Sequence, residues 1–305
     1  MKKQLTIFLV LFLMFAATAQ VQVTSGKVQR FENFKSKLID ARNIDVWLPD
    51  GYSEKEKYAV LYMHDGQALY DTQSTWNKQA WEIDEVAGKL IAEGKAQKFI
   101  VVGIWNNGAK RHPEYFPQKP FENLTQIQRD TVTAQLQKAG RTKDIFKPYS
   151  DLYLQFLVTE VKPFIDKTLS TKKDQKNTFV AGSSMGGLIS MYAICEYPKV
   201  FGGAACLSTH WPGTFSSNNN PIPNAFVAYL KKKLPNPKDH KIYFDYGDQT
   251  LDAMYKPLQE KVDVVMKAKG FTNKNWETKF FPGENHSEVA WAKRLDIPLL
   301  FLLKN

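Results

Sequence analysis

The chain has 305 residues, of which 43% are hydrophobic and 13% aromatic, so it is long enough to bury one sizeable core. Its formal net charge is +10, but the lysines are spread over predicted loops and helix faces and form no cluster with aromatic residues, which argues against a nucleic-acid partner. The two cysteines, Cys195 and Cys206, lack the CxxC spacing of a metal knuckle or redox pair; they could form one disulfide, although their apolar surroundings favour two buried thiols.

The first residues have the composition of an export signal. Two lysines precede an apolar run from residue 5 to residue 15, and the sequence ATA follows as a small-residue cleavage site. The apolar run is shorter than the roughly 20 residues that a membrane-spanning helix needs. We therefore predict a signal peptide over 1–19, a single domain over 20–305 without stable membrane insertion, and a secreted or periplasmic location.

Seven β-rich segments alternate with helical periodicity along the rest of the chain. The predicted strands are 41–49, 58–65, 98–105, 177–182, 202–208, 241–247 and 276–283. Helical spacing is found over 152–165, where Pro163 predicts a kink near the end, and over 251–266, where Pro257 belongs in a first turn. The alternation predicts an α/β fold with a mostly parallel central sheet flanked by helices.

The segment 117–149 interrupts this alternation. It is polar, poor in strand-forming residues and partly helical. We predict an insertion over one edge of the sheet, which is either a lid or a plain surface excursion.

The sequence GSSMGG at 182–187 lies between a predicted strand and a predicted helix. A residue at such a sharp strand-to-helix turn has a strained backbone and needs small neighbours, which Gly182 and Gly186 supply. The turn would expose Ser184 at the carboxyl end of the sheet, with the backbone N–H of Met185 available to an oxyanion. We therefore predict that Ser184 is a nucleophile.

A serine nucleophile needs a base and a carboxylate that orients the base. His286 directly follows the last predicted strand and is the predicted base, whereas His240 lies in a polar turn that is typical of a surface residue. His210, next to Trp211 at another strand end, suits a substrate pocket better. Asp248 and Asp252 both follow the strand 241–247, and position alone does not separate them as the acid.

With these motifs placed, the chain resembles the esterase D-like family of α/β-hydrolases, which includes feruloyl and acetyl-xylan esterases, siderophore trilactone esterases and S-formylglutathione hydrolases. The resemblance covers most of the mature chain. It rests on the block 41–71, on VVGIWNNGAKRHPEYFP at 101–117, on GSSMGG and on GENHSEVAW at 283–291. The resemblance implies an α/β-hydrolase fold, and it places S-formylglutathione in doubt as a substrate because of the export signal and the insertion.

The resemblance also implies residue roles. It favours Asp252 as the acid, with Asp248 as the alternative, and it implies that Gln67, in the loop after the first central strand, gives a second oxyanion N–H. Arg111 and Glu114 would rim the site and either contact substrate or pair with each other. His64 and Asp65 have no further ligand cluster beside them in the sequence, so we expect no metal and no cofactor.

These observations predict a secreted serine esterase that hydrolyses acyl groups, acetyl or feruloyl, from carbohydrate through an acyl-enzyme. The alternatives are a siderophore trilactone esterase, an acyltransferase and a non-catalytic binding protein with the hydrolase fold. The expected partner is a small-molecule or carbohydrate ester. The aromatic residues Trp105, Tyr115, Trp211 and Trp291 are expected near the site, although some would serve core packing instead.

Overall fold

The computed structural model describes residues 21–75 and 77–305. The predicted signal peptide, 1–19, lies outside the described residues. Within the described part of the chain, no helix has the length and apolar character needed to cross a membrane.

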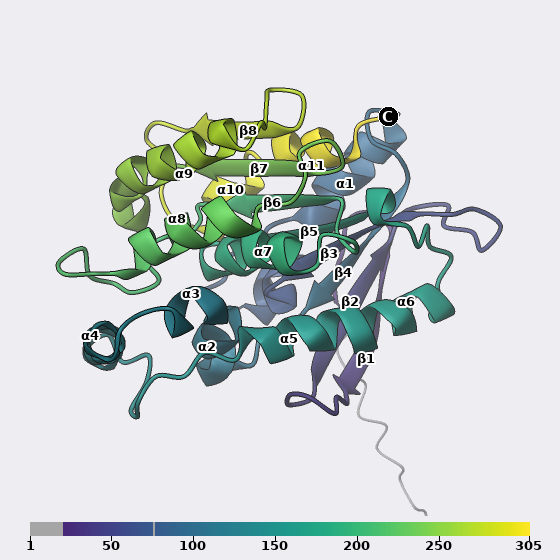
Figure 1. Cartoon of the computed structure of the whole chain (residues 1–305). Helices are drawn as coiled ribbons and strands as arrows, with labels where there is room; N and C mark the ends of the chain where they lie inside the picture. The colour runs from purple at the N-terminus through teal and green to yellow at the C-terminus, as the bar shows by residue number, and fades with distance from the viewer. Residues whose placement is uncertain (1–20, 76) are drawn as a thin grey trace, which may run out of the picture.

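A single eight-stranded sheet forms the centre of the molecule (Figure 1), in the order β1-β2-β4-β3-β5-β6-β7-β8. The strands are β1 (Lys27–Phe34), β2 (Arg42–Leu48), β3 (Ala59–His64), β4 (Phe99–Ile104), β5 (Thr178–Ser183), β6 (Gly203–Leu207), β7 (Lys241–Tyr246) and β8 (Trp276–Phe280). The last seven confirm the predicted strands. Sequence analysis missed β1, an edge strand whose half-exposed, polar residues give no clear alternation.

The pairing explains where a site can form. The strands β1, β2 and β4 are joined by antiparallel pairs, and the strands from β4 through β3 to β8 pair in parallel. The carboxyl ends of β3 to β8 therefore meet at one edge of the sheet, where open α/β folds bind their ligands. The mostly parallel sheet with flanking helices confirms the predicted fold class.

The helices cover both faces of the sheet. The α-helices are α1 (Ile83–Ala92), α2 (Arg111–Tyr115), α3 (Gln118–Glu122), α4 (Gln126–Lys138), α5 (Ser150–Phe156), α6 (Lys162–Thr168), α7 (Met185–Glu196), α8 (Ile222–Lys233), α9 (Lys256–Ala268), α10 (Glu288–Ala292) and α11 (Asp296–Leu303). Successive residues of β3 point to opposite cores. Val60 and Tyr62 pack with α5, α7, α8 and α9, and Leu61 and Met63 pack with α1, α10 and α11.

The prediction that Pro257 lies in a first turn is confirmed, and Pro163 also lies at the start of a helical segment. The predicted helix over 152–165 is split by one π-helical stretch, Leu157–Val161, and Pro163 lies in the first turn of the α6 segment that follows. Pro257 lies in the first turn of α9, where its missing N–H removes no helical hydrogen bond.

The predicted insertion contains α3, α4 and the chain that leads to Tyr149. Val132 and Leu136 on α4 are fully buried against Phe146, so the insertion packs onto the core through an apolar face. Gln135 also bonds to the Thr214 hydroxyl in the loop after β6. The insertion is thus joined to a second excursion at the carboxyl edge of the sheet.

Cys195 on α7 and Cys206 on β6 are both buried free thiols. Burial raises the pKa of both thiols, so both remain protonated and inert at neutral pH.

Candidate active site

Ser184 occupies the turn between β5 and α7. Its φ of 57° and ψ of −121° place a non-glycine residue in a strained backbone conformation. A Cβ on Gly182 would lie 2.7 Å from the backbone carbon of Gly186, so only glycine allows the strand and the helix to approach this closely. The backbone N–H of Ser184 donates to Leu207 O at 3.0 Å, which ties the turn to β6.

The turn opens into a cleft of about 870 Å³ at the carboxyl edge of the sheet. Of the predicted catalytic, oxyanion-hole and substrate-contact residues, six line it: Gln67, Arg111, Ser184, Met185, His210 and His286. They come from loops after β3, β4, β5, β6 and β8. The parallel sheet therefore brings together side chains that are far apart in the sequence.

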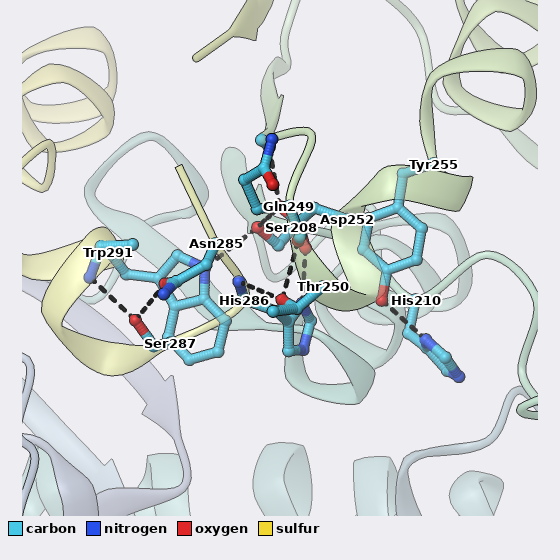
Figure 2. A network of polar contacts seen from close by, with 12 residues as sticks. Ser208, His210, Gln249, Thr250, Asp252, Tyr255, Asn285, His286, Ser287 and Trp291 are labelled. Carbon is cyan, nitrogen blue, oxygen red and sulfur yellow. Dashed lines mark hydrogen bonds and ion pairs between the residues drawn. The ribbon is translucent and has the colours of Figure 1, made fainter. Parts of the chain in front are cut away.

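His286 lies in the loop between β8 and α10, and Figure 2 shows its ring beside Asp252. His286 Nδ1 is 2.6 Å from Asp252 Oδ1, and the Asp252 side chain is fully buried. Because a carboxylate only accepts hydrogen bonds, the bond assigns the proton to Nδ1 and leaves Nε2 as a base. The His286 backbone N–H donates to Thr250 Oγ1 at 3.0 Å, which fixes the loop.

Asp252 and Asp248 have different partners. Asp252 Oδ2 accepts from the Gly247 N–H at 2.7 Å and from Ser208 Oγ at 2.6 Å, in addition to the bond of Oδ1 to His286. Asp248 Oδ1 accepts from the Gly283 N–H at 2.9 Å and stabilises the turn after β8. Of the two candidates that position alone left open, Asp252 is the one that contacts His286.

The predicted oxyanion donors belong to two different elements. Met185 begins α7, so its N–H is one of the first N–H groups of the helix, which have no carbonyl partner within it. Gln67 lies in the short 3₁₀ turn Gly66–Ala68 after β3. A Cβ on Gly66 would lie 2.5 Å from the backbone carbon of Gly103, so a glycine is needed to bring this turn against β4.

Arg111 and Glu114 do not pair with each other, contrary to one of the two predicted alternatives. Arg111 makes a bidentate ion pair with Asp65, at 2.6 and 2.8 Å, on the wall of the cleft. Burial raises the pKa of Asp65, but the charge and hydrogen bonds of Arg111 outweigh burial and hold this pKa below its ordinary value. Glu114 is buried in a bidentate pair with Arg42 and does not line the cleft.

Trp211 also lies away from the cleft, which differs from its predicted place beside substrate. Its side chain is buried, its indole N–H donates to Gln259 at 2.8 Å, and its ring packs on Phe244. Trp105 bonds Asp45, and the Tyr115 hydroxyl accepts from the Asp65 N–H. Of the four aromatic residues expected near the site, Trp291 alone lines the cleft.

The other histidines have fixed environments. His210 Nδ1 is 2.7 Å from the Tyr255 hydroxyl, while its Nε2 is buried without a partner among the described residues. Burial lowers the pKa of His210 well below its ordinary value, so this ring is neutral. His240 is buried and within bonding distance of the carbonyls of Pro198 and Asn236, so its predicted surface position is wrong. His64 faces the Tyr153 hydroxyl at 2.7 Å, and burial lowers the pKa of His64 to about 3.

Two kinds of residue at this site were not predicted from the sequence, one buried beside the histidines and the other on the walls of the cleft. Tyr255 packs edge-on to His286, and its hydroxyl lies 2.7 Å from His210 Nδ1, yet in the sequence it belongs to the apolar stripe of a helix. The remaining walls carry neutral amides and further aromatic and basic residues from unrelated loops: Asn77, Gln79, Trp81, Asn106, Arg141 and Phe215. Loop composition carries no indication of which of these residues face the site.

The model of the Esterase family, described as "Putative esterase", matches residues 36–301, and the chain belongs to this family. This membership places the chain in the class of carboxylic ester hydrolases.

Named proteins that are similar to this chain are described as esterases. An endo-1,4-beta-xylanase/feruloyl esterase of Xylanibacter ruminicola is 24% identical over 90% of this chain, which spans only 31% of that longer protein. The solved structure of a ferulic acid esterase matches 91% of this chain and 98% of its own with a TM-score of 0.64 at 20% identity. The enterobactin esterase FES from Shigella flexneri matches 92% of this chain and 60% of its own with a TM-score of 0.66 at 14% identity. These two structural likenesses establish the fold.

Proposed function

We propose that this chain is an exported serine esterase that removes acyl groups from carbohydrate through an acyl-enzyme. The observation that carries the proposal is that Ser184, on its strained turn, and His286, which is bonded to the buried Asp252, line one cleft. The composition of residues 1–19 supports export.

The reaction follows from the proton positions. His286 Nε2 takes the Ser184 proton as Oγ attacks the ester carbonyl, and Asp252 stabilises the imidazolium that forms. The N–H groups of Met185 and Gln67 stabilise the oxyanion of the tetrahedral intermediate. His286 then protonates the leaving alcohol, and water repeats the sequence to release the acid and regenerate Ser184. All of these steps use side chains and backbone groups of the protein itself.

The walls of the cleft favour a neutral carbohydrate ester over a ferric siderophore. Among the described residues, the charged side chains that line the cleft are two carboxylates and two guanidiniums, namely Asp65, Glu288, Arg111 and Arg141, and Asp65 neutralises Arg111. An anionic iron complex would need an excess of positive charge. The neutral amides of Asn77, Gln79 and Asn106 on these walls instead suit sugar hydroxyls.

His210 supplies a further contact in this proposal. His210 lines the cleft, and its buried Nε2 has no hydrogen-bond partner among the described residues, which is costly for a polar atom. A hydroxyl or carbonyl oxygen of the bound ester would satisfy it.

The proposal is tested with the mature protein on p-nitrophenyl acetate, methyl ferulate, acetylated xylan and a ferric siderophore trilactone, with Ser184→Ala as control. We expect turnover of the carbohydrate-type esters that disappears in Ser184→Ala. Preference for the trilactone would mean that the substrate is a siderophore ester and not a carbohydrate ester. Transfer of the acyl group to added acceptor alcohols that is faster than hydrolysis would indicate an acyltransferase. A folded protein that turns over none of these esters and leaves Ser184 unlabelled by a fluorophosphonate would indicate a binding protein.

A further inference from the structure

Behind the His286–Asp252 pair lies a buried group of polar side chains centred on Ser208. Ser208 directly follows β6, and Figure 2 shows its side chain next to Asp252. Its Oγ lies 2.6 Å from Asp252 Oδ2, 3.0 Å from Trp291 Nε1 and 3.1 Å from Arg294 Nη2. All four residues are buried.

The chemistry of these groups fixes the direction of each hydrogen bond. Indole and guanidinium N–H groups only donate, so Trp291 and Arg294 occupy the two lone pairs of Ser208 Oγ. The single hydroxyl proton of Ser208 must therefore point to Asp252 Oδ2. A hydroxyl that accepts two donors, one of them charged, is polarised and donates more strongly.

Arg294 is held in turn by Asp245 on β7. Its Nη2 and Nε lie 2.9 and 3.2 Å from the two Asp245 oxygens, and Asp245 Oδ1 also accepts the Ser208 backbone N–H at 3.1 Å. The chain of contacts from Asp245 through Arg294 and Ser208 to Asp252 joins β7, the segment between α10 and α11, the end of β6 and the loop that carries the acid.

We infer that Ser208 is a positioning residue that fixes the Asp252 carboxylate for His286; this inference rests on the proposed catalytic roles of Ser184, His286 and Asp252. Ser208 and the Gly247 N–H both bind Oδ2 and so prevent the carboxylate from rotating. Oδ1 is thereby kept at 2.6 Å from His286 Nδ1. Arg294 acts on Asp252 only through the Ser208 hydroxyl.

Two substitutions at Ser208 separate the effect of losing the hydroxyl from the effect of backbone strain. Ser208 has a φ of 40°, a conformation that glycine adopts without strain, so Ser208→Gly removes the hydroxyl and is expected to fold. Ser208→Ala removes the same hydroxyl but keeps the strain. The matched control is Thr209→Val, which removes a neighbouring buried hydroxyl that donates to Cys206 O instead of to the acid.

We expect both Ser208 variants to lose about 10-fold or more in kcat, with KM within about two-fold, because a hydrogen bond to a charged group is lost. Without the Ser208 proton the carboxylate charge is less stabilised and holds the protonated imidazole more tightly. The acid limb of kcat/KM should therefore move to higher pH. Thr209→Val should match the wild type in both respects.

Several results would overturn the inference. One is a kcat of the Ser208 variants within two-fold of the wild-type value. Another is an acid limb of kcat/KM that stays in place or moves to lower pH. A third is a loss of kcat in Ser208→Ala that is absent from Ser208→Gly. A fluorophosphonate probe, which labels an activated serine with loss of fluoride, gives the same comparison without knowledge of the natural ester. If the wild type itself is unlabelled, the proposed function fails; if wild type and Ser208→Gly are labelled equally fast with the same pH dependence, only the role of Ser208 fails.

Discussion

His286 Nδ1 lies 2.6 Å from Asp252 Oδ1, whereas Asp248, four residues earlier, binds the backbone N–H of Gly283. Asp252→Asn is expected to lower kcat by about 10³-fold or more, because an amide at this position favours the wrong imidazole tautomer. Asp248→Asn should cost less than about three-fold. Steady-state kinetics of the two variants with p-nitrophenyl acetate checks this, and the opposite ranking would make Asp248 the acid.

The positive φ of Ser184 predicts that the protein gives up some stability to place its candidate nucleophile. Ser184→Ala and Ser184→Gly should both abolish turnover, but only the glycine relieves the backbone strain at φ 57°. We expect the free energy of unfolding of Ser184→Gly to exceed that of Ser184→Ala by about 1 kcal/mol. Urea unfolding of both variants measures the difference, and equal stabilities would show that the turn stores no strain.

Gly247 lies where the segment that leads to Asp252 contacts the loop that carries His286. A Cβ at this position would lie 2.1 Å from Glu284 O, two residues before His286, so Gly247→Ala must displace one of the two loops. We expect a fall in kcat of about 10²-fold, as for other small displacements of catalytic groups. Gly94→Ala, at a glycine whose Cβ would meet nothing within 4 Å, is the control for a general loss of stability. Full activity in Gly247→Ala would mean that the loops tolerate separation.

The unpaired Nε2 of His210 predicts an effect on binding. His210→Leu is expected to raise KM for the preferred ester about 10-fold while kcat changes less, because the lost contact is made to substrate. Substrate saturation curves for the wild type and the variant give the two constants separately. An unchanged KM would show that His210 only supports Tyr255.

Buried neutral histidines predict loss of stability in acid. Burial lowers the pKa of His64 and of His112 to about 3, and that of His210 well below its ordinary value. Between about pH 6.5 and pH 3 the unfolded chain therefore binds protons at these rings that the folded chain does not, and the free energy of unfolding falls as pH falls, by about 1.4 kcal/mol per pH unit for each ring.

Urea unfolding at pH 7 and pH 4.5 tests this expectation. The variant His112→Gln keeps a side-chain donor for Gly213 O, the carbonyl that His112 Nε2 contacts at 3.0 Å, but cannot titrate. Its stability should fall with pH less steeply than that of the wild type, by the share of one ring. Identical slopes would mean that His112 is already charged in the folded protein.

The local pattern of the sequence was sufficient for the fold class and for seven of the eight described strands, because buried parallel strands are apolar and strand-to-helix turns need glycine. It placed Ser184 and His286 at the ends of β5 and β8 for the same reason. It could not choose between Asp248 and Asp252, since the choice depends on contacts with His286, more than 30 residues away. Trp211 lies at a strand end as expected, but packing around Phe244 and Gln259 directs its side chain into the core.

The partner of Arg111 also depends on long-range structure. Its ion pair with Asp65 joins the loop after β4 to the loop after β3, which are neighbours only because β4 and β3 pair in the sheet. A pair with Glu114 was one of the two alternatives predicted for Arg111, but Glu114 belongs to a buried pair with Arg42 on β2. The order of the strands therefore determined which charges face the cleft.

The two buried thiols make the protein suitable for site-specific labelling. Cys195 and Cys206 are the only cysteines of the chain, and neither exposes a reactive thiolate. A cysteine introduced at Ile127, whose side chain is 79% exposed on α4, would therefore react first with a maleimide dye. Fluorescence from that dye, recorded as an ester is added, would report whether α4 moves when the cleft is filled.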